Sequence, residues 1–150
     1  MDRPKTYFEG VLQLRNPTPA IIDFVADEVE KTPSVWIAKT KKLKNGIDLF
    51  LSSNKFLADI ARKLKDNFTG EILRSNTLFS EDKQTSKVLY RGCYLFRYYD
   101  IKKGDKVIIR GQTIQIIAIG KELLAKDMET QRKVHIKFAD LKDARIEKID

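Results

Sequence analysis

Cysteine and histidine are almost missing from the sequence, which has one residue of each among 150. The single Cys93 excludes a disulfide framework and a zinc site made from several cysteines of this chain, and it favours a reducing compartment. The ligand spacings Cys-x-x-Cys and His-x-x-x-His do not occur. We therefore expect no bound metal and no cofactor.

Long apolar runs are absent too. No stretch reaches the roughly 18 uninterrupted apolar residues that a membrane-spanning helix needs. The first ten residues lack the apolar region of a signal peptide. The sequence thus predicts a soluble, cytoplasmic protein with no membrane partner.

Side chains that could carry catalysis are few. His135 lies in a strand-like segment between two lysines, so we expect a surface or barrel-wall residue rather than a general base. Cys93 lies in an apolar strand, where a free cysteine usually behaves as a small buried hydrophobe. The segment 110–121 contains glycines but neither the ending of a phosphate-binding loop nor a following helix. We expect no enzymatic activity.

Positive charge is what the sequence has in excess. Lys and Arg number 29 against 21 Asp and Glu, which gives a formal charge of +8 and a pI near 9.5. With 42% hydrophobic residues the chain can still bury a core. A basic folded protein favours phosphate-rich partners such as RNA, DNA or an anionic membrane face, and charge alone does not choose among them.

Strand and helix signals alternate through the first two thirds of the chain. Residues 7–15 alternate as a strand, and Thr18 can cap a helix that has Pro19 at its first position. Residues 34–42 and 46–53 are predicted strands, and Asn45-Gly46 between them predicts a type I′ hairpin turn. The apolar face of the first helix comprises Ile21, Ile22, Phe24, Val25 and Val29.

A second helix follows, capped by Ser53 or Asn54 and closed by Gly70, with a basic outer face. Two further strands surround the polar loop 80–85. The order β-α-β-β-α-β-β predicts an α+β domain at residues 1–99, with an antiparallel sheet and both helices on one face. Short strands and closely spaced turns then predict a small SH3-like or OB-like β-barrel at residues 100–150.

The segment 87–100 contains an aromatic row. Alternation places Val88, Tyr90, Tyr94, Phe96 and Tyr98 on one face and Leu89, Arg91, Cys93, Leu95 and Arg97 on the other. "RGCYLF" is similar to the aromatic strand of RNA-recognition motifs, whose rings stack on bases. In that fold the motif lies on the strand before the second helix, whereas in this sequence the segment lies after the second helix. We therefore interpret the aromatic row as core.

Basic clusters are the better candidates for nucleic-acid contact, because lysine and arginine bind phosphates. A lysine run can equally be a solvated face. The candidate RNA-binding residues are Lys39, Lys41, Lys42, Lys44, Arg62, Lys63, Lys65, Arg91, Arg97, Lys102, Lys103 and Lys106.

Taken in order, several segments resemble the nonsense-mediated-decay-three family, the archaeal and eukaryotic export adaptors of the large ribosomal subunit. They are "YFEGVLQLR", "NGIDLFLSS", "NKFLADIARKL", "GEILRSNTL", "VLYRGCYLFR" and "IKKGDKVIIRG". The resemblance implies translation-factor-like β-barrels and a factor without catalytic activity. It also implies binding to the large subunit near its tRNA exit region, with contacts to ribosomal RNA and proteins.

Two features depart from the family pattern. The usual amino-terminal Cys-x-x-Cys pairs are missing, so we expect a short, archaeal-type member, or a zinc-bearing module that is a separate polypeptide or lies outside this sequence. The leucine-rich export signal of eukaryotic members is missing as well, so nuclear export is not implied.

The sequence leads to one hypothesis about the lysine-rich hairpin and leaves two rival functions open. We expect Ile47, Leu49 and Leu51 to be buried against the second helix, with the lysines directed at rRNA phosphate and Asp48 capping or paired with a nearby lysine or arginine. The rival function is a KOW-like or SH3-like RNA-binding module of translation or transcription. A magnesium nuclease built on Asp48 with Glu9 or Glu71 is a third, remote alternative.

Overall fold

Two helices and a five-stranded sheet form the first part of the chain. The computed structural model describes residues 4–82 and 87–147, and of residues 76–82, 87–90 and 143 it describes only the backbone. The elements are β1 (Gly10–Arg15), α1 (Pro19–Glu30), β2 (Ile37–Leu43), β3 (Gly46–Leu51), α2 (Asn54–Asn67), β4 (Gly70–Asp82) and β5 (Lys87–Tyr98). This is the predicted β-α-β-β-α-β-β order, so the α+β fold class is confirmed.

The first sheet has the strand order β2-β3-β1-β5-β4. The pairs β2–β3, β1–β3 and β4–β5 are antiparallel as expected, but β1–β5 is parallel. Because α2 carries the chain back along the sheet, β4 runs in the direction of β3. Its hairpin partner β5 therefore runs in the direction of β1, and the prediction of a purely antiparallel sheet is wrong at this pair.

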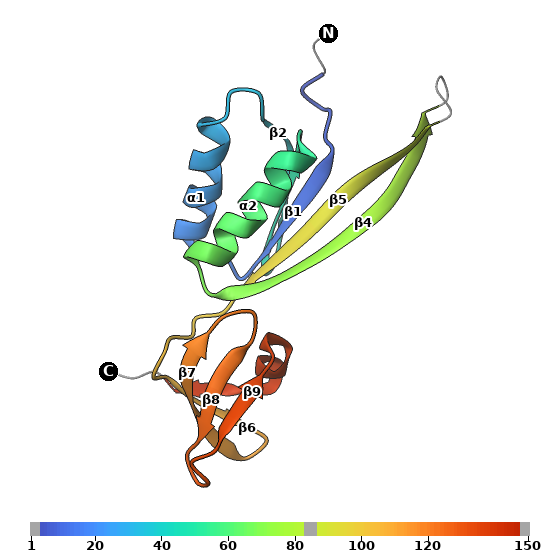
Figure 1. The fold of residues 1–150 in the computed structure, drawn as a ribbon. Helices are drawn as coiled ribbons and strands as arrows, with labels where there is room; N and C mark the ends of the chain where they lie inside the picture. Colours follow the sequence, from blue (N-terminus) through green and yellow to red (C-terminus); the bar gives the residue numbers. More distant parts are fainter. Residues whose placement is uncertain (1–3, 83–86, 148–150) are drawn as a thin grey trace. The chain divides into compact units, whose positions relative to one another are not determined.

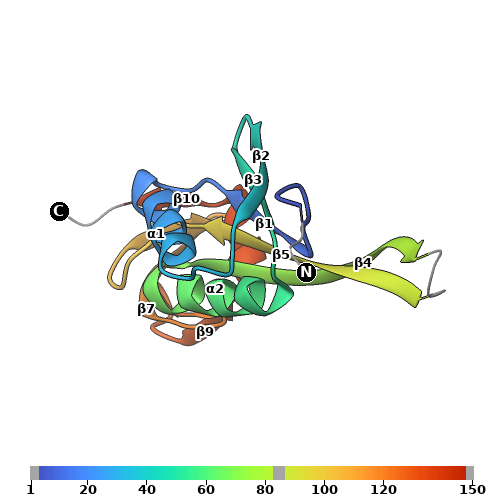
Figure 2. The same cartoon turned by 90° about the horizontal axis from the view of Figure 1, so that it is seen from above.

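Both helices pack on one face of this sheet (Figures 1 and 2). Leu12 and Leu14 of β1 are fully buried in the same core cluster as Ile21 of α1 and Leu57 of α2. The predicted apolar face of α1 is wrong at Ile22, which is 39% exposed because it points away from this cluster.

The predicted helix caps are also present. The Thr18 hydroxyl accepts a hydrogen bond from the Ile21 N–H, with Pro19 at the first helical position. Ser53 accepts from the Phe56 N–H at the start of α2. Each cap satisfies a backbone N–H that a helix start would otherwise leave unpaired. Neither helix of the described chain is long and apolar enough to span a membrane.

The β2–β3 hairpin lies where Asn45-Gly46 predicted it, but the turn type is wrong. The turn residues are Lys44 and Asn45, and neither they nor Gly46 has a positive φ. Gly46 begins β3, and a Cβ built on it would lie 1.9 Å from the Leu14 carbonyl oxygen. Glycine is thus required at position 46 because β1 approaches so closely.

A second five-stranded sheet follows, in which every pair is antiparallel. Its order is β10-β6-β7-β8-β9, so the last strand returns to pair with the first. This is consistent with the predicted small β-barrel. Its elements are β6 (Lys106–Ile109), β7 (Gln112–Ile119), β8 (Leu123–Asp127), β9 (Lys133–Ile136), the 3-10 helix η1 (Phe138–Asp143) and β10 (Arg145–Glu147).

The chain divides into two compact units, Met1–Tyr98 and Tyr99–Asp150. Each has its own apolar cluster; that of the second unit includes Val107, Ile116 and Leu123. Whether residues 1–99 and 100–150 behave as separate domains stays a prediction.

Candidate nucleic-acid interface

The lysine run of the hairpin is divided between two faces. The four side chains are exposed, on β2 at the edge of the sheet or in the turn after it: Lys39, Lys41, Lys42 and Lys44. Lys42 is the register partner of Ile47, which packs against the core on the helix side. Since side chains alternate along a strand, Lys41 points to the opposite side, as does Lys39, the partner of Phe50.

That opposite side, which we call the open face, is the surface of the first sheet away from α1 and α2. Strand register assigns it Val11, Gln13, Arg15, Lys39, Lys41, Asp48, Phe50, Glu71, Leu73, Ser75, Arg91, Cys93, Leu95 and Arg97. Basic side chains outnumber acidic ones in this set. The open face therefore brings together four predicted RNA-binding residues from two strands: Lys39, Lys41, Arg91 and Arg97.

An ion pair joins β1 and β3 on the open face. Arg15 Nη1 donates to Asp48 Oδ1 at 2.8 Å, and the two side chains are only 12% and 11% exposed. The predicted pairing of Asp48 with a basic residue is thus confirmed. Arg15 is not among the candidate residues from the sequence, because only the pairing of β1 with β3, in which Gln13 faces Asp48 and Arg15 faces Gly46, brings its side chain within reach of Asp48.

The carboxylates proposed for magnesium have other partners. Glu9 accepts hydrogen bonds from the Tyr7 hydroxyl at 2.6 Å and from the Asn54 N–H at 2.9 Å. Over the described ranges, no group of three or more His, Cys, Asp or Glu side chains is placed to hold a metal ion. The nuclease alternative gains no support from this arrangement.

Two cations of the open face lie over aromatic rings, in what we call the cation–aromatic cluster: Phe8, Lys39, Phe50 and Arg91. The guanidinium carbon of Arg91 is 4.1 Å from the centroid of the Phe8 ring, and Arg91 Nε donates to the Phe8 carbonyl at 3.2 Å. Lys39 Nζ is 5.4 Å from the Phe50 centroid, and the two rings meet edge to face at 5.0 Å. Such contacts hold a cation in position while leaving its charge in place.

Arg97 lies farther along β5. Its guanidinium is 3.5 Å from Glu71 on β4, and its side chain is 38% exposed. In such a partly exposed pair, Glu71 offsets part of the positive charge that Arg97 adds to the open face.

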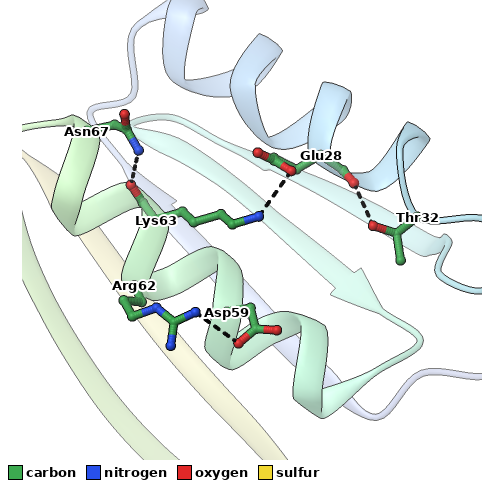
Figure 3. Close-up of polar contacts among 6 residues, drawn as sticks. All are labelled: Glu28, Thr32, Asp59, Arg62, Lys63 and Asn67. Atoms are coloured by element: carbon green, nitrogen blue, oxygen red, sulfur yellow. Dashed lines mark hydrogen bonds and ion pairs between the residues drawn. The ribbon is translucent and has the colours of Figure 1, made fainter.

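The basic face of α2 is used for contacts within the first unit (Figure 3). Lys63 Nζ lies 3.4 Å from Glu28 of α1, and Arg62 lies 3.4 Å from Asp59. Lys65 is half-buried and donates to the Gly70 carbonyl; burial lowers its pKa, and the nearby Glu71 partly offsets this. The structure does not bring these residues to the open face, because α2 covers the other side of the sheet.

The aromatic row of β5 faces the core, as the sequence interpretation proposes. Phe96 is fully buried, and Tyr94 and Tyr98 pack against the same cluster. The glycine of "RGCYLF" serves packing, because the Asn54 side chain accepts a hydrogen bond from the Gly92 N–H and leaves little space for a Cβ. The side chains of Val88, Leu89 and Tyr90 lie outside the described residues.

The remaining candidate cations belong to the second unit. Lys102 and Lys103 are exposed in the turn before β6, and Lys106 is half-buried. Asp105, 1% exposed, accepts from the Lys102 N–H at 2.8 Å, and Gly104 adopts a φ of 96°. The turn thereby fixes the backbone that carries both exposed lysines.

His135 and Cys93, the two side chains considered as catalytic residues, lie on β9 and β5. His135 is exposed on β9, as expected. Cys93 is half-buried on the open face rather than in the core, because odd positions of β5 point away from the helices. Burial raises the pKa of its thiol, which a hydrogen bond from Ser75 partly counters, so the thiolate is a minor form at neutral pH.

The fold and this surface describe a basic protein of α+β architecture. A family comparison is more specific, because residues 7–97, more than half of the chain, match the model of the second domain of NMD3. The protein belongs to the NMD3 family, and the resemblance noted in the sequence is confirmed. This is a non-catalytic, adaptor-type family involved in the binding and export of the large ribosomal subunit. No curated protein matches the chain.

Proposed function

We propose that this protein is a non-catalytic factor that binds the large ribosomal subunit during its maturation in the cytoplasm and contacts ribosomal RNA through basic surfaces. Family membership supports the subunit as partner. The cation–aromatic cluster is the observation that carries the RNA contact. Arg91 and Lys39 are already positioned by Phe8 and Phe50, so binding a phosphate costs them less side-chain entropy than it costs a freely moving lysine.

We assign the principal rRNA contacts to Lys39, Lys41, Arg91 and Arg97 on the open face. Arg62, Lys63 and Lys65 are weaker candidates, since each already has a partner within the first unit. Lys102, Lys103 and Lys106 would form a second contact from the other unit. Lys42 and Lys44 point elsewhere and serve below as controls.

Co-sedimentation with isolated large and small subunits, at low and near-physiological salt, tests the proposal. We expect selective migration with the large subunit that survives the higher salt. The double variant Lys39→Gln/Lys41→Gln should bind more weakly. Its salt dependence should have a log-log slope smaller by roughly 0.7 to 0.9 for each phosphate that the variant no longer neutralises.

The matched control is Lys42→Gln/Lys44→Gln, which removes the same charge from the same hairpin on its other side. It should bind the subunit about as well as the parent protein. Two outcomes would refute the assignment: equal weakening by both double variants, or equal binding to both subunits that is lost as salt rises. Either would mean non-specific attraction to RNA.

A generic RNA-binding module of the KOW or SH3-like type is the second candidate. The observation that favours it is the fixed turn carrying Lys102 and Lys103 on a barrel-like unit. Such a module binds short free RNAs, whereas the subunit factor needs the assembled particle. Tight binding of a short RNA that Lys102→Gln/Lys103→Gln abolishes would favour the module.

A further inference from the structure

A groove of about 400 Å³ lies between the end of the β2–β3 hairpin and the start of α1. Its size is within the range of small ligand sites. Ile22 lines it and is one of two large hydrophobic side chains that are exposed in the described part of the chain. The apolar lining residues are Pro17, Ile22, Leu43 and Ile47.

Two lysines are the charged residues of the lining, Lys42 and Lys44. Both are exposed, and within the described ranges neither side chain has an ion-pair or hydrogen-bond partner. The groove therefore combines an apolar floor with a positive rim.

The strand beside the groove is open to pairing. β2 is an edge strand that pairs with β3 alone among the described strands. Lysines on an edge disfavour pairing with another copy of the same basic chain, because the like charges repel. They do not disfavour, and indeed attract, an acidic segment.

We propose that this groove binds a short acidic segment of a partner protein. One apolar side chain of the segment inserts against Ile22 and Ile47, while its carboxylates pair with Lys42 and Lys44. An RNA backbone satisfies the rim but not the apolar floor, which is why a peptide fits these observations better. This surface is separate from the open face of the proposed function.

The probe is the acetylated peptide Asp-Glu-Asp-Leu-Phe-Asp-Glu-Asp, titrated into the full-length ¹⁵N-labelled protein and followed by NMR shifts. A peptide with serine in place of leucine and phenylalanine tests the apolar contribution, and an octamer of uridine tests RNA. We expect shifts at the groove residues, and we expect the serine peptide to bind at least about tenfold more weakly.

Variants on the two faces of the sheet distinguish specific binding in the groove from general electrostatic attraction. Ile22→Ser and Lys42→Gln/Lys44→Gln should each weaken peptide binding by about three- to tenfold, whereas Lys39→Gln/Lys41→Gln should leave it unchanged. All these positions are exposed, so each variant should keep the parent spectrum away from its own site.

Several results would overturn the proposal: absence of binding, shifts that map elsewhere, equal binding of the serine peptide, or equal weakening by both lysine pairs. Binding of the uridine octamer in the groove at the strength of the peptide would do the same. Because subunit binding depends on the other lysine pair, failure here leaves the proposed function standing.

Discussion

Replacing Gly46 by alanine tests how the lysine-bearing hairpin is attached to the rest of the sheet. The new Cβ would lie 1.9 Å from the Leu14 carbonyl oxygen and 3.0 Å from its carbonyl carbon. Both atoms belong to the backbone of β1, so no side-chain rotation relieves the overlap. Reaching an ordinary contact requires β1 and β3 to separate by about 1.5 Å where Arg15 faces Gly46.

Such a displacement has two costs. Overpacking typically destabilises by about 1–3 kcal/mol. Breaking or lengthening a ladder hydrogen bond between the strands adds about 1 kcal/mol. We expect Gly46→Ala to lower the free energy of unfolding by about 2–4 kcal/mol, a large fraction of the roughly 5–15 kcal/mol that stabilises a typical domain.

Urea unfolding followed by tryptophan fluorescence measures this destabilisation in the first unit, because Trp36, the one tryptophan of the chain, lies there. The control is Asn45→Ala in the same turn. Asn45 has no positive φ, so the control should cost less than about 1 kcal/mol. Similar small effects for both variants would show that position 46 tolerates a Cβ, and would refute the steric explanation.

Three further outcomes are expected. Asp48→Asn leaves Arg15 without its charged partner in a nearly buried site. It should lower the free energy of unfolding by about 2–4 kcal/mol in the same fluorescence assay. The exposed Asp59→Asn should change that free energy by less than about 0.5 kcal/mol. Burial lowers the pKa of Lys65 in the folded protein, so below that folded pKa the charged amine destabilises the fold. The free energy of unfolding should therefore rise as pH increases from the folded pKa toward the ordinary value of 10.5. This rise should be smaller in Lys65→Met. Cys93, whose thiol pKa is raised, should be alkylated by iodoacetamide at pH 8 more slowly than a free-cysteine peptide, and an equal rate would contradict the burial of its sulfur.

Local features of the fold are predictable because local physics produces them. The caps at Thr18 and Ser53, and the 3.6-residue spacing of α2, depend only on neighbouring residues. The parallel β1–β5 pair depends on where the β4–β5 hairpin docks, which no local pattern encodes. Gly46 illustrates the same limit: the sequence correctly marks a special position, but the reason is β1, a strand that is distant along the chain.

The sequence predicts which residues of the candidate site are charged, but not which of them lie together on one face. Four lysines that are consecutive or nearly so in the sequence separate onto two faces, while Arg91 joins Lys39 although they lie on different strands. Alternation along β2 gives the division only once the register with Ile47 is known. The aromatic partner of Arg91 cannot be found this way, because the alternating residues 7–15 include Phe8 in the predicted strand, whereas β1 begins only at Gly10.

The two proposed surfaces share one strand, and this bears on whether both can be occupied at once. Side chains on opposite faces of a strand are directed away from each other, so an rRNA phosphate at Lys41 does not obstruct a carboxylate at Lys42. The remaining coupling is electrostatic repulsion between two bound anions. With a Debye length of about 8 Å at physiological salt, exposed charges on opposite sides of the sheet are substantially screened from each other. The strand can therefore serve two ligands nearly independently, so a partner protein held in the groove would stay bound while the open face engages or releases RNA.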